Sequence, residues 1–423
     1  MSKKHHHNGK KASNKSNHFT VTKMCIIRLA SIPLVMTLGN SMLIPVLPIL
    51  EKKVDISSFQ SSMIITSYSI AAIILIPVAG YLSDRIGRKA VILPSLLLAL
   101  IGGLIAGFAS WKLDDPFTWI IIGRILQGIG ASGAMPIVLP LVGDLYRNDD
   151  EKTSATLGII ETSNTFGKVL SPILGSAFAA LLWFLPFFSI SIFSLISILL
   201  IMFYVKPPKE KRKPDKLKVF LSKVKHTFKK EGKWLLSIFL NGIFVMFVLF
   251  GVLFFLSEEL EKIHHIKGIK KGFILAIPLL FLCIASFRTG RKIQGKLSLM
   301  KKIMVVSLAS TSISVVFVGF VKDKLILLLI VTSILGVAIG ALLPVLDALI
   351  TENIKKRQRG TISSFYSSAR FIGVAAGPPV VSLVLDNFIN GLYITFSVAG
   401  LILLFLVIKF IDIKELEKRK RAL

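Results

Sequence analysis

Long apolar runs separated by short charged segments make up most of the chain. A transmembrane helix needs ~20 predominantly apolar residues, and twelve runs approach or exceed that length. The pattern therefore predicts an all-α membrane protein with twelve transmembrane helices. The runs lie at about 24–50, 61–82, 90–110, 118–142, 154–181, 183–205, 234–256, 272–287, 302–320, 325–349, 361–385 and 391–411.

Composition supports a membrane protein, since 53% of the residues are hydrophobic and only 18% are charged. A net charge of +29 would suggest a nucleic-acid partner if the basic residues shared one soluble surface. They are instead divided among loops between apolar runs, so we expect a lipid bilayer and no nucleic acid as the partner. Lysines and arginines gather in alternate loops and in both tails, which by the positive-inside rule predicts cytoplasmic termini. We expect a multi-pass protein of the cell membrane, of the bacterial plasma membrane type.

A basic segment divides the chain after the sixth run. Residues 206–233 hold twelve lysines and arginines against three acids, which is typical of a cytoplasmic linker. The two halves resemble each other, because GKVLSP in the fifth run (167–172) corresponds to GVAAGP, which ends in Gly377 and Pro378, in the eleventh. We therefore predict a tail (1–23), a six-helix bundle (24–205), the linker (206–233), a second six-helix bundle (234–411) and a basic tail (412–423).

A charged loop, GYLSDRIGRK, connects the second and third runs. Gly80 and Gly87 allow close backbone approach or a positive φ. Asp84 lies among cations that include Arg85 and Arg88, and its carboxylate can accept hydrogen bonds from arginine or from a helix start. A basic turn that merely obeys the positive-inside rule is the simpler interpretation.

The loop closely resembles the signature loop between helices 2 and 3 of the major facilitator superfamily. The resemblance implies two pseudo-symmetric six-helix bundles around a central cavity. It also implies that Asp144 at the end of helix 4 lies beside Arg88, while Asp84 points at the start of helix 11, so that the loop acts as a conformational latch. Asp347 occupies the corresponding position in helix 10, and we interpret it too as structural.

Helix 1 contains the sequence GNSMLIPVLP, which includes Asn40. Pro45 and Pro48 each remove a backbone donor, so the pair should bend the span near its external end. The motif resembles the first helix of twelve-span drug:proton antiporters within the superfamily.

Helix 4 carries Arg124, followed by Gln127 and Gly128. An arginine inside an apolar span costs ~2.5 kcal/mol or more on insertion scales, so it should face a cavity, an acid or a carbonyl. Snorkelling to the external interface is the alternative. The arrangement resembles the family's helix 4 motif, in which the arginine is associated with proton coupling.

Helix 5 has a polar face, because Glu161, Asn164, Lys168, Pro172 and Gly175 follow steps of three and four residues. The stretch from Gly167 resembles the family's antiporter motif, with Ser171 and Ser176 where glycines are usual. Packing alone explains the glycines and the proline.

Glu161 is the acid that the pattern places well inside a span, and we predict that it is the principal proton-binding carboxylate. A dry cavity favours its protonated form, whereas the nearby Lys168 favours the carboxylate, so the two effects oppose each other. A static salt bridge between them is the alternative. Arg370 in helix 11 corresponds to the position near Asn164, either as a charge in the same cavity or as part of a cytoplasmic gate.

These observations predict a monomeric transporter, not an enzyme, that exports small amphipathic compounds such as drugs by proton antiport and alternating access. A dedicated exporter of an endogenous metabolite, such as a siderophore or glycolipid, is the main alternative. A channel or a receptor is a third possibility, although the sequence shows no selectivity filter or charged ring. Because no phosphate-binding G-x-x-x-x-G-K-[ST] loop is present, we expect a proton gradient rather than ATP as the energy source, with no cofactor and no metal.

Overall fold

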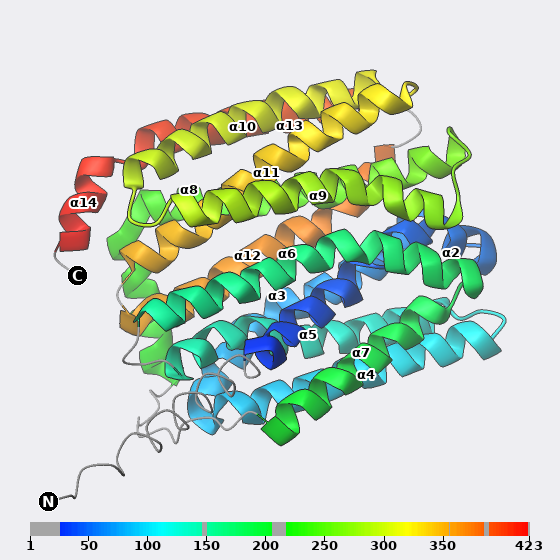
Figure 1. Ribbon diagram of the computed structural model, residues 1–423, viewed down its shortest axis with the longest axis horizontal. Coiled ribbons are helices and arrows are strands. Elements are labelled where there is room, and N and C mark those ends of the chain that lie inside the picture. The colour runs from blue at the N-terminus through cyan, green and yellow to red at the C-terminus, as the bar shows by residue number, and fades with distance from the viewer. Residues whose placement is uncertain (1–25, 146–149, 205–216, 355, 385–388, 422–423) are drawn as a thin grey trace, which may run out of the picture.

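The structure is a computed structural model, and it describes residues 26–145, 150–204, 217–354, 356–384 and 389–421. The predicted N-terminal tail and part of the basic linker lie outside these ranges. The described part consists of helices joined by short turns (Figure 1), in agreement with the predicted all-α fold.

Long antiparallel helices, joined by short turns, cross the molecule from end to end. The first span, Ile26–Val54, consists of a helix over residues 26–41, the 3₁₀ turn η1 (Ile44–Val46) and the short helix α2 (Leu47–Val54). The others are α3 (Ser58–Ile86), α4 (Arg88–Lys112), α5 (Phe117–Leu145), α6 (Asp150–Leu181), α7 (Leu185–Tyr204), α8 (Leu217–Lys262), α9 (Gly268–Lys292), α10 (Leu297–Phe320), α11 (Leu325–Asn353), α12 (Lys356–Val384), α13 (Ile389–Phe410) and the short α14 (Ile413–Arg421).

Eleven helices of the described part are long and apolar enough to cross a membrane. The remaining predicted span, 154–181, forms α6, which is 32 residues long but carries the polar face predicted for it. That face lowers its mean hydropathy and leaves α6 outside the eleven. The prediction of a bend in helix 1 is confirmed. The 3₁₀ turn η1, which contains Pro45, interrupts the span, and Pro48 lies in the first turn of α2.

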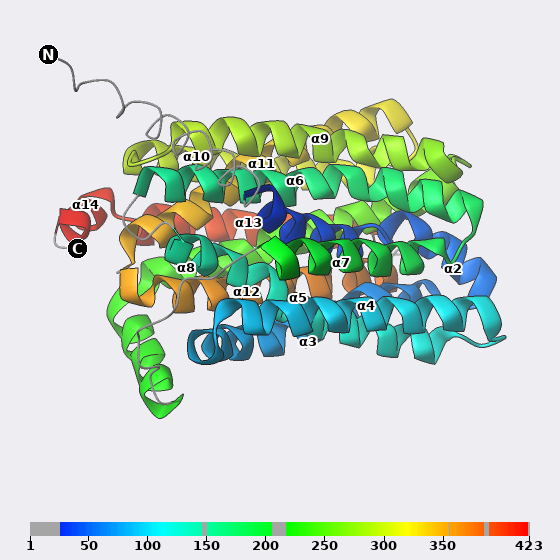
Figure 2. The same cartoon turned by 60° about the horizontal axis from the view of Figure 1, so that its bottom comes forward.

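Helix ends follow local sequence signals. Ser57 and Gln60 form a reciprocal capping box at the start of α3. Gly87 ends that helix with φ of +101°, a conformation that other residues rarely adopt. At Gly232 the helix α8 kinks, and Figure 2 shows its N-terminal part leaving the bundle. Residues 217–231 of the predicted linker are thus helical.

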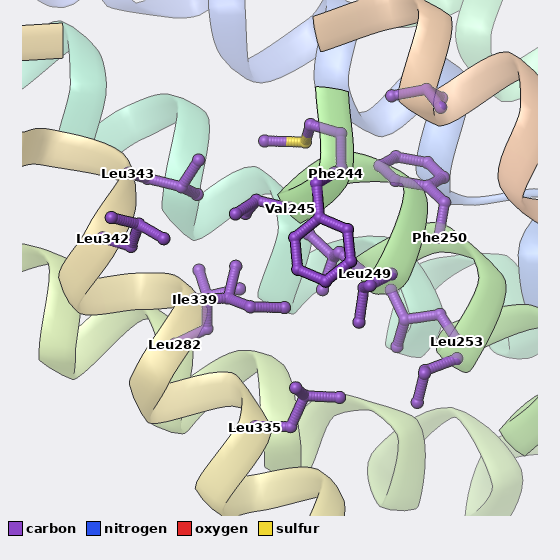
Figure 3. Packing of buried hydrophobic residues seen from close by; sticks show 14 of the residues in the cluster. Phe244, Val245, Leu249, Phe250, Leu253, Leu282, Leu335, Ile339, Leu342 and Leu343 are labelled. Atoms are coloured by element: carbon purple, nitrogen blue, oxygen red, sulfur yellow. The ribbon is translucent and has the colours of Figure 1, made fainter. Parts of the chain in front are cut away.

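Two helix pairs join the halves: α3 packs against α12, and α6 packs against α9 (Figures 1 and 2). Inside the second half, side chains of α8, α9 and α11 meet in the core, as Figure 3 shows for Leu249, Leu282 and Ile339. We call the end of the bundle that holds Gly87 the linker end, and the end that holds Asp55 the distal end. In Figure 1, α14 marks the linker end and α2 the distal end.

Glycines have a packing role on the corresponding helices of the two halves, α6 and α12. A Cβ atom at Gly175 of α6 would lie 2.0 Å from the carbonyl oxygen of Met42 in the first span. In the second half, a Cβ atom at Gly373 of α12 would lie 2.1 Å from the carbonyl oxygen of Ile243 in α8. Small residues at both positions therefore let the corresponding helix pairs approach closely.

Replacing Gly175 by alanine should destabilise the protein by about 1–3 kcal/mol, because the new methyl group forces two backbones apart. Gly158→Ala in the same helix is the matched control, since nothing lies within 4 Å of its Cβ position and alanine favours a helix over glycine. Thermal unfolding of the purified variants measures the difference. Equal midpoints for the two variants would contradict the close approach of α6 to the first span.

Candidate functional site

Four charged side chains from three helices form a central charged cluster, which we define as Glu161, Lys168, Asp347 and Arg370. Glu161 and Lys168 belong to α6, whereas Asp347 lies on α11 and Arg370 on α12. Arg370 Nη1 lies 3.5 Å from Asp347 Oδ1, and the fields of Glu161, Asp347 and Arg370 all act on the Lys168 ammonium. The cluster therefore joins the polar face of α6 to the other half of the protein.

Asp347 makes contacts that its predicted structural role did not include. The sequence treats it as the counterpart of Asp144 and hence as a structural residue of the helix edge. In the structure it pairs with Arg370 and lies in the field of Glu161 and Lys168. The repeat between the two halves indicates where a residue lies along its helix. It does not specify which neighbour the side chain faces.

Glu161 is half-buried and is held by its own helix. Its Oε1 accepts a hydrogen bond of 3.2 Å from the Asn164 amide, and the Asn164 oxygen accepts one from Thr37 of the first span. Both residues are among those described, and no ion pair joins Glu161 to Lys168 in that part of the chain. The static salt bridge, one of the two sequence-based alternatives, is therefore not formed in this state.

Lys168 is the least satisfied member of the central charged cluster. Its side chain is buried, and its Nζ has no hydrogen-bond partner. It lines a cavity of about 10 Å³ between the halves, roughly the space of one water molecule. The walls are mostly apolar: Ser41, Ile44, Pro45, Pro172, Leu249, Phe250, Leu253, Leu275 and Leu279.

Arg124 is fully buried and ties three helices together. It donates hydrogen bonds to the carbonyl oxygens of Ile64 in α3 (2.8 Å) and Gly39 in the first span (2.9 Å). It also donates to the side chains of Gln127 and Asn40, and its guanidinium lies 4.5 Å from the ring centroid of Tyr68. Snorkelling to an interface is therefore excluded, and the expectation of carbonyl partners is met.

The loop between α3 and α4 brings Arg88 and Asp144 together, as the resemblance implies. Arg88 Nε lies 3.2 Å from Asp144 Oδ2, and the same guanidinium pairs with Asp84. Arg88 and Asp144 border a surface depression of about 680 Å³, and Gly80 lies against Ser364 of α12. The predicted approach of Asp84 to the start of helix 11 concerns side chains outside the described residues.

Asp84→Asn should slow transport of every substrate several-fold with little change in apparent affinity, because it weakens a contact at the linker end that touches no ligand. Initial rates over a range of substrate concentrations separate the two effects. Asp115→Asn, at an exposed position in the distal loop before α5, controls for the loss of a surface charge. A large, substrate-selective change in affinity would contradict the latch role.

Sequence reasoning missed a second group of charges at the distal end. Glu261 of α8 bridges Lys52 of α2 (2.8 Å) and Lys271 of α9 (3.0 Å). Lys262 pairs with Glu258 at 2.8 Å and lies 3.8 Å from Glu51 of α2. Glu258, Glu261 and Lys271 are buried, so this distal ion-pair network closes the halves against each other.

The signal for the distal ion-pair network was present but ambiguous. Alternating acids and lysines flank the ends of the first and seventh spans, and such charges are usually solvated loop residues. Only the convergence of α2, α8 and α9 turns them into buried pairs. Among the described residues, no group of three histidine, cysteine or acidic side chains could hold a metal ion.

Comparison with known proteins agrees with this architecture. The sequence model of the Major Facilitator Superfamily matches residues 29–300 and 299–422. A protein of Bacillus subtilis (strain 168) named bacillibactin exporter is 51% identical over 395 residues, which cover 93% of this chain and 98% of the relative. Multidrug resistance protein 2 of the same organism is 25% identical over 86% of this chain and 89% of its own length.

Among solved structures, the crystal structure of the human organic anion transporter MFSD10 (TETRAN) superimposes with a TM-score of 0.72. The superposition covers 91% of this chain and 99% of that one, at 19% identity, and so bears on the fold alone. The family match over nearly the whole sequence and the 51% identical relative identify the chain as a membrane transporter that belongs to the Major Facilitator Superfamily.

Proposed function

We propose that this transporter exports a siderophore of the bacillibactin type from the cytoplasm, driven by protons that enter in exchange. The observation that carries the choice of substrate is the 51% identity to a bacillibactin exporter across 98% of that protein's length. A dedicated metabolite exporter, the main alternative from the sequence, thereby becomes the preferred function. In this orientation, the linker end faces the cytoplasm and the distal end faces the outside of the cell.

Proton coupling is assigned to Glu161. Its carboxyl is half-buried, accepts a hydrogen bond from Asn164 and is free of an ion pair with Lys168, so it can take up or release a proton without breaking a salt bridge. Asp347, by contrast, is already paired with Arg370 at 3.5 Å. We therefore assign the proton to Glu161 rather than to Asp347.

Alternating access is supported by contacts at the two ends of the bundle. At the distal end, the pairs Lys52–Glu261 and Glu51–Lys262 cross between the halves. Toward the linker end, Gly80 of α3 lies against Ser364 of α12, whose hydroxyl oxygen is 3.1 Å from the Cβ position of that glycine. Opening toward one side requires the contacts at that end to separate while the others hold, and we propose that a single chain carries this out as a monomer.

Transport by proteoliposomes containing the purified protein tests the proposal. We expect bacillibactin to be transported against its gradient when a pH difference is imposed, and the transport to stop when the difference is collapsed by an ionophore. Empty liposomes measure leakage. If bacillibactin is not transported while ethidium is, the proposed substrate is wrong.

Export of amphipathic drugs is the second candidate function. It is favoured by the similarity to a multidrug resistance protein over 86% of this chain and by the apolar walls of the cavity beside Lys168. Running ethidium and bacillibactin in parallel separates a drug transporter from a dedicated exporter.

A further inference from the structure

The Lys168 ammonium occupies a position that is costly for a free charge. Its side chain is 7% exposed, and its Nζ has no hydrogen-bond partner within the described structure. An ion transferred to a low-dielectric interior loses several kcal/mol of hydration, and such residues inside membrane spans are usually tied to a function. Lys168 therefore needs a partner that is absent from the protein itself.

The nearby charges do not supply that partner. Glu161 is held by Asn164, and Asp347 is paired with Arg370. Arg124 is surrounded by carbonyl and amide oxygens rather than acids. Both carboxylates of the central charged cluster are thus engaged by other groups, and the Lys168 ammonium has no direct counter-ion among the described residues.

The walls around the Lys168 ammonium indicate the rest of the ligand. Leu249, Phe250 and Leu253 lie along one stretch of α8 (Figure 3), and Leu275 and Leu279 come from α9. These helices belong to the half opposite Lys168. A ligand that fills the cavity when the halves separate would place an anionic group on Lys168 and an apolar or aromatic body against α8 and α9.

We propose that Lys168 is the anion-binding residue of the substrate site, and that the site takes organic oxyanions carried on an apolar or aromatic body. This inference rests on the proposed export function and assigns Lys168 to substrate binding rather than to proton transfer. In the closed state, the cavity of about 10 Å³ excludes the ligand, so binding requires the halves to move apart.

Ligand-induced thermal stabilisation of the purified full chain tests the proposal. The probes are bacillibactin, 1-naphthoate and 1-naphthamide, of which the last two differ only in whether the headgroup is charged. We expect 1-naphthoate to reach half-saturation at a concentration at least tenfold below that of 1-naphthamide, since truncating one partner of a buried charge pair typically costs tenfold or more in affinity.

The variants are Lys168→Met, Lys168→Gln and Lys168→Arg, with Lys267→Met as the control at an exposed position of the distal loop. The preference for the anion should vanish in the methionine and glutamine variants and persist in the arginine and control variants. Without ligand, Lys168→Met should melt above the parent, because an unpartnered buried ammonium is replaced by an apolar side chain of similar length.

Equal binding of the acid and the amide by the parent would overturn the proposal, as would a preference for the acid that survives in Lys168→Met or Lys168→Gln. If 1-naphthoate binds through Lys168 while bacillibactin gives no stabilisation, the anion site stands and the proposed substrate is wrong.

Discussion

Replacing Glu161 by glutamine should abolish uphill transport driven by a pH difference, while exchange of substrate down its gradient continues. Glutamine mimics the protonated carboxyl in shape and hydrogen bonding but cannot release a proton. The Asn164 amide, which donates to Glu161 at 3.2 Å, can still donate to the glutamine oxygen, so the helix packing should be preserved. Proteoliposomes loaded for counterflow and, separately, for pH-driven uptake measure the two activities.

Asp323→Asn, in the distal turn between α10 and α11, is the control for removal of a carboxylate far from the central charged cluster. It should leave both activities unchanged. Undiminished pH-driven transport in Glu161→Gln would refute the assignment, and Asp347 would then become the better candidate, since it shares the cluster.

Replacing Arg124 by alanine should lower both the stability of the folded protein and its pH-driven transport. Four hydrogen bonds from its guanidinium reach the first span, α3 and α5. Alanine would leave the buried side-chain oxygens of Gln127 and Asn40 without this donor, at about 1–3 kcal/mol for each unsatisfied group. We expect a severe loss of folded protein and of pH-driven transport.

Arg124→Lys should retain part of the function, because a cation remains while the planar fork that reaches several acceptors is lost. Yield, melting temperature and pH-driven transport of the two variants, measured side by side, provide the comparison. Equal behaviour of alanine, lysine and parent proteins would show that the buried network around Arg124 is dispensable.

The fold was predictable because a bilayer imposes one simple requirement. Spans must be long, apolar and internally hydrogen-bonded, so run length and loop charge suffice to locate them. Local signals were equally direct: Pro45 and Pro48 marked the interruption of the first span, and Gly175 and Gly373 marked helix contacts in both halves. Even the weak hydropathy of α6 follows from the polar face seen in its sequence.

The arrangement of charges was only partly predictable. The pairing of Arg88 with Asp144 could be inferred because a family motif fixes both residues in space. The distal ion-pair network could not, since Lys52, Glu261 and Lys271 lie on three helices whose ends converge only after folding. The same limit applied to Asp347, whose position along α11 was known while its partner Arg370 on α12 was not.

With the roles proposed for Glu161 and Lys168, the central charged cluster would have two distinct tasks. In this assignment, the Glu161 carboxyl would exchange the proton and the Lys168 ammonium would hold the anionic substrate. Antiport requires proton uptake by Glu161 and substrate binding at Lys168 to alternate within the cycle, so that proton uptake accompanies substrate release. Both residues lie on α6, so the two events would be coupled through one helix.

Simultaneous recording of proton and substrate fluxes tests the central claim most directly. Proteoliposomes containing the parent protein, a trapped pH indicator and a bacillibactin gradient are followed without an imposed pH difference. The account predicts that downhill movement of bacillibactin drives protons in the opposite direction, and that Glu161→Gln moves the substrate without any proton flux. Substrate movement by the parent protein with no accompanying proton flux would contradict proton-coupled export.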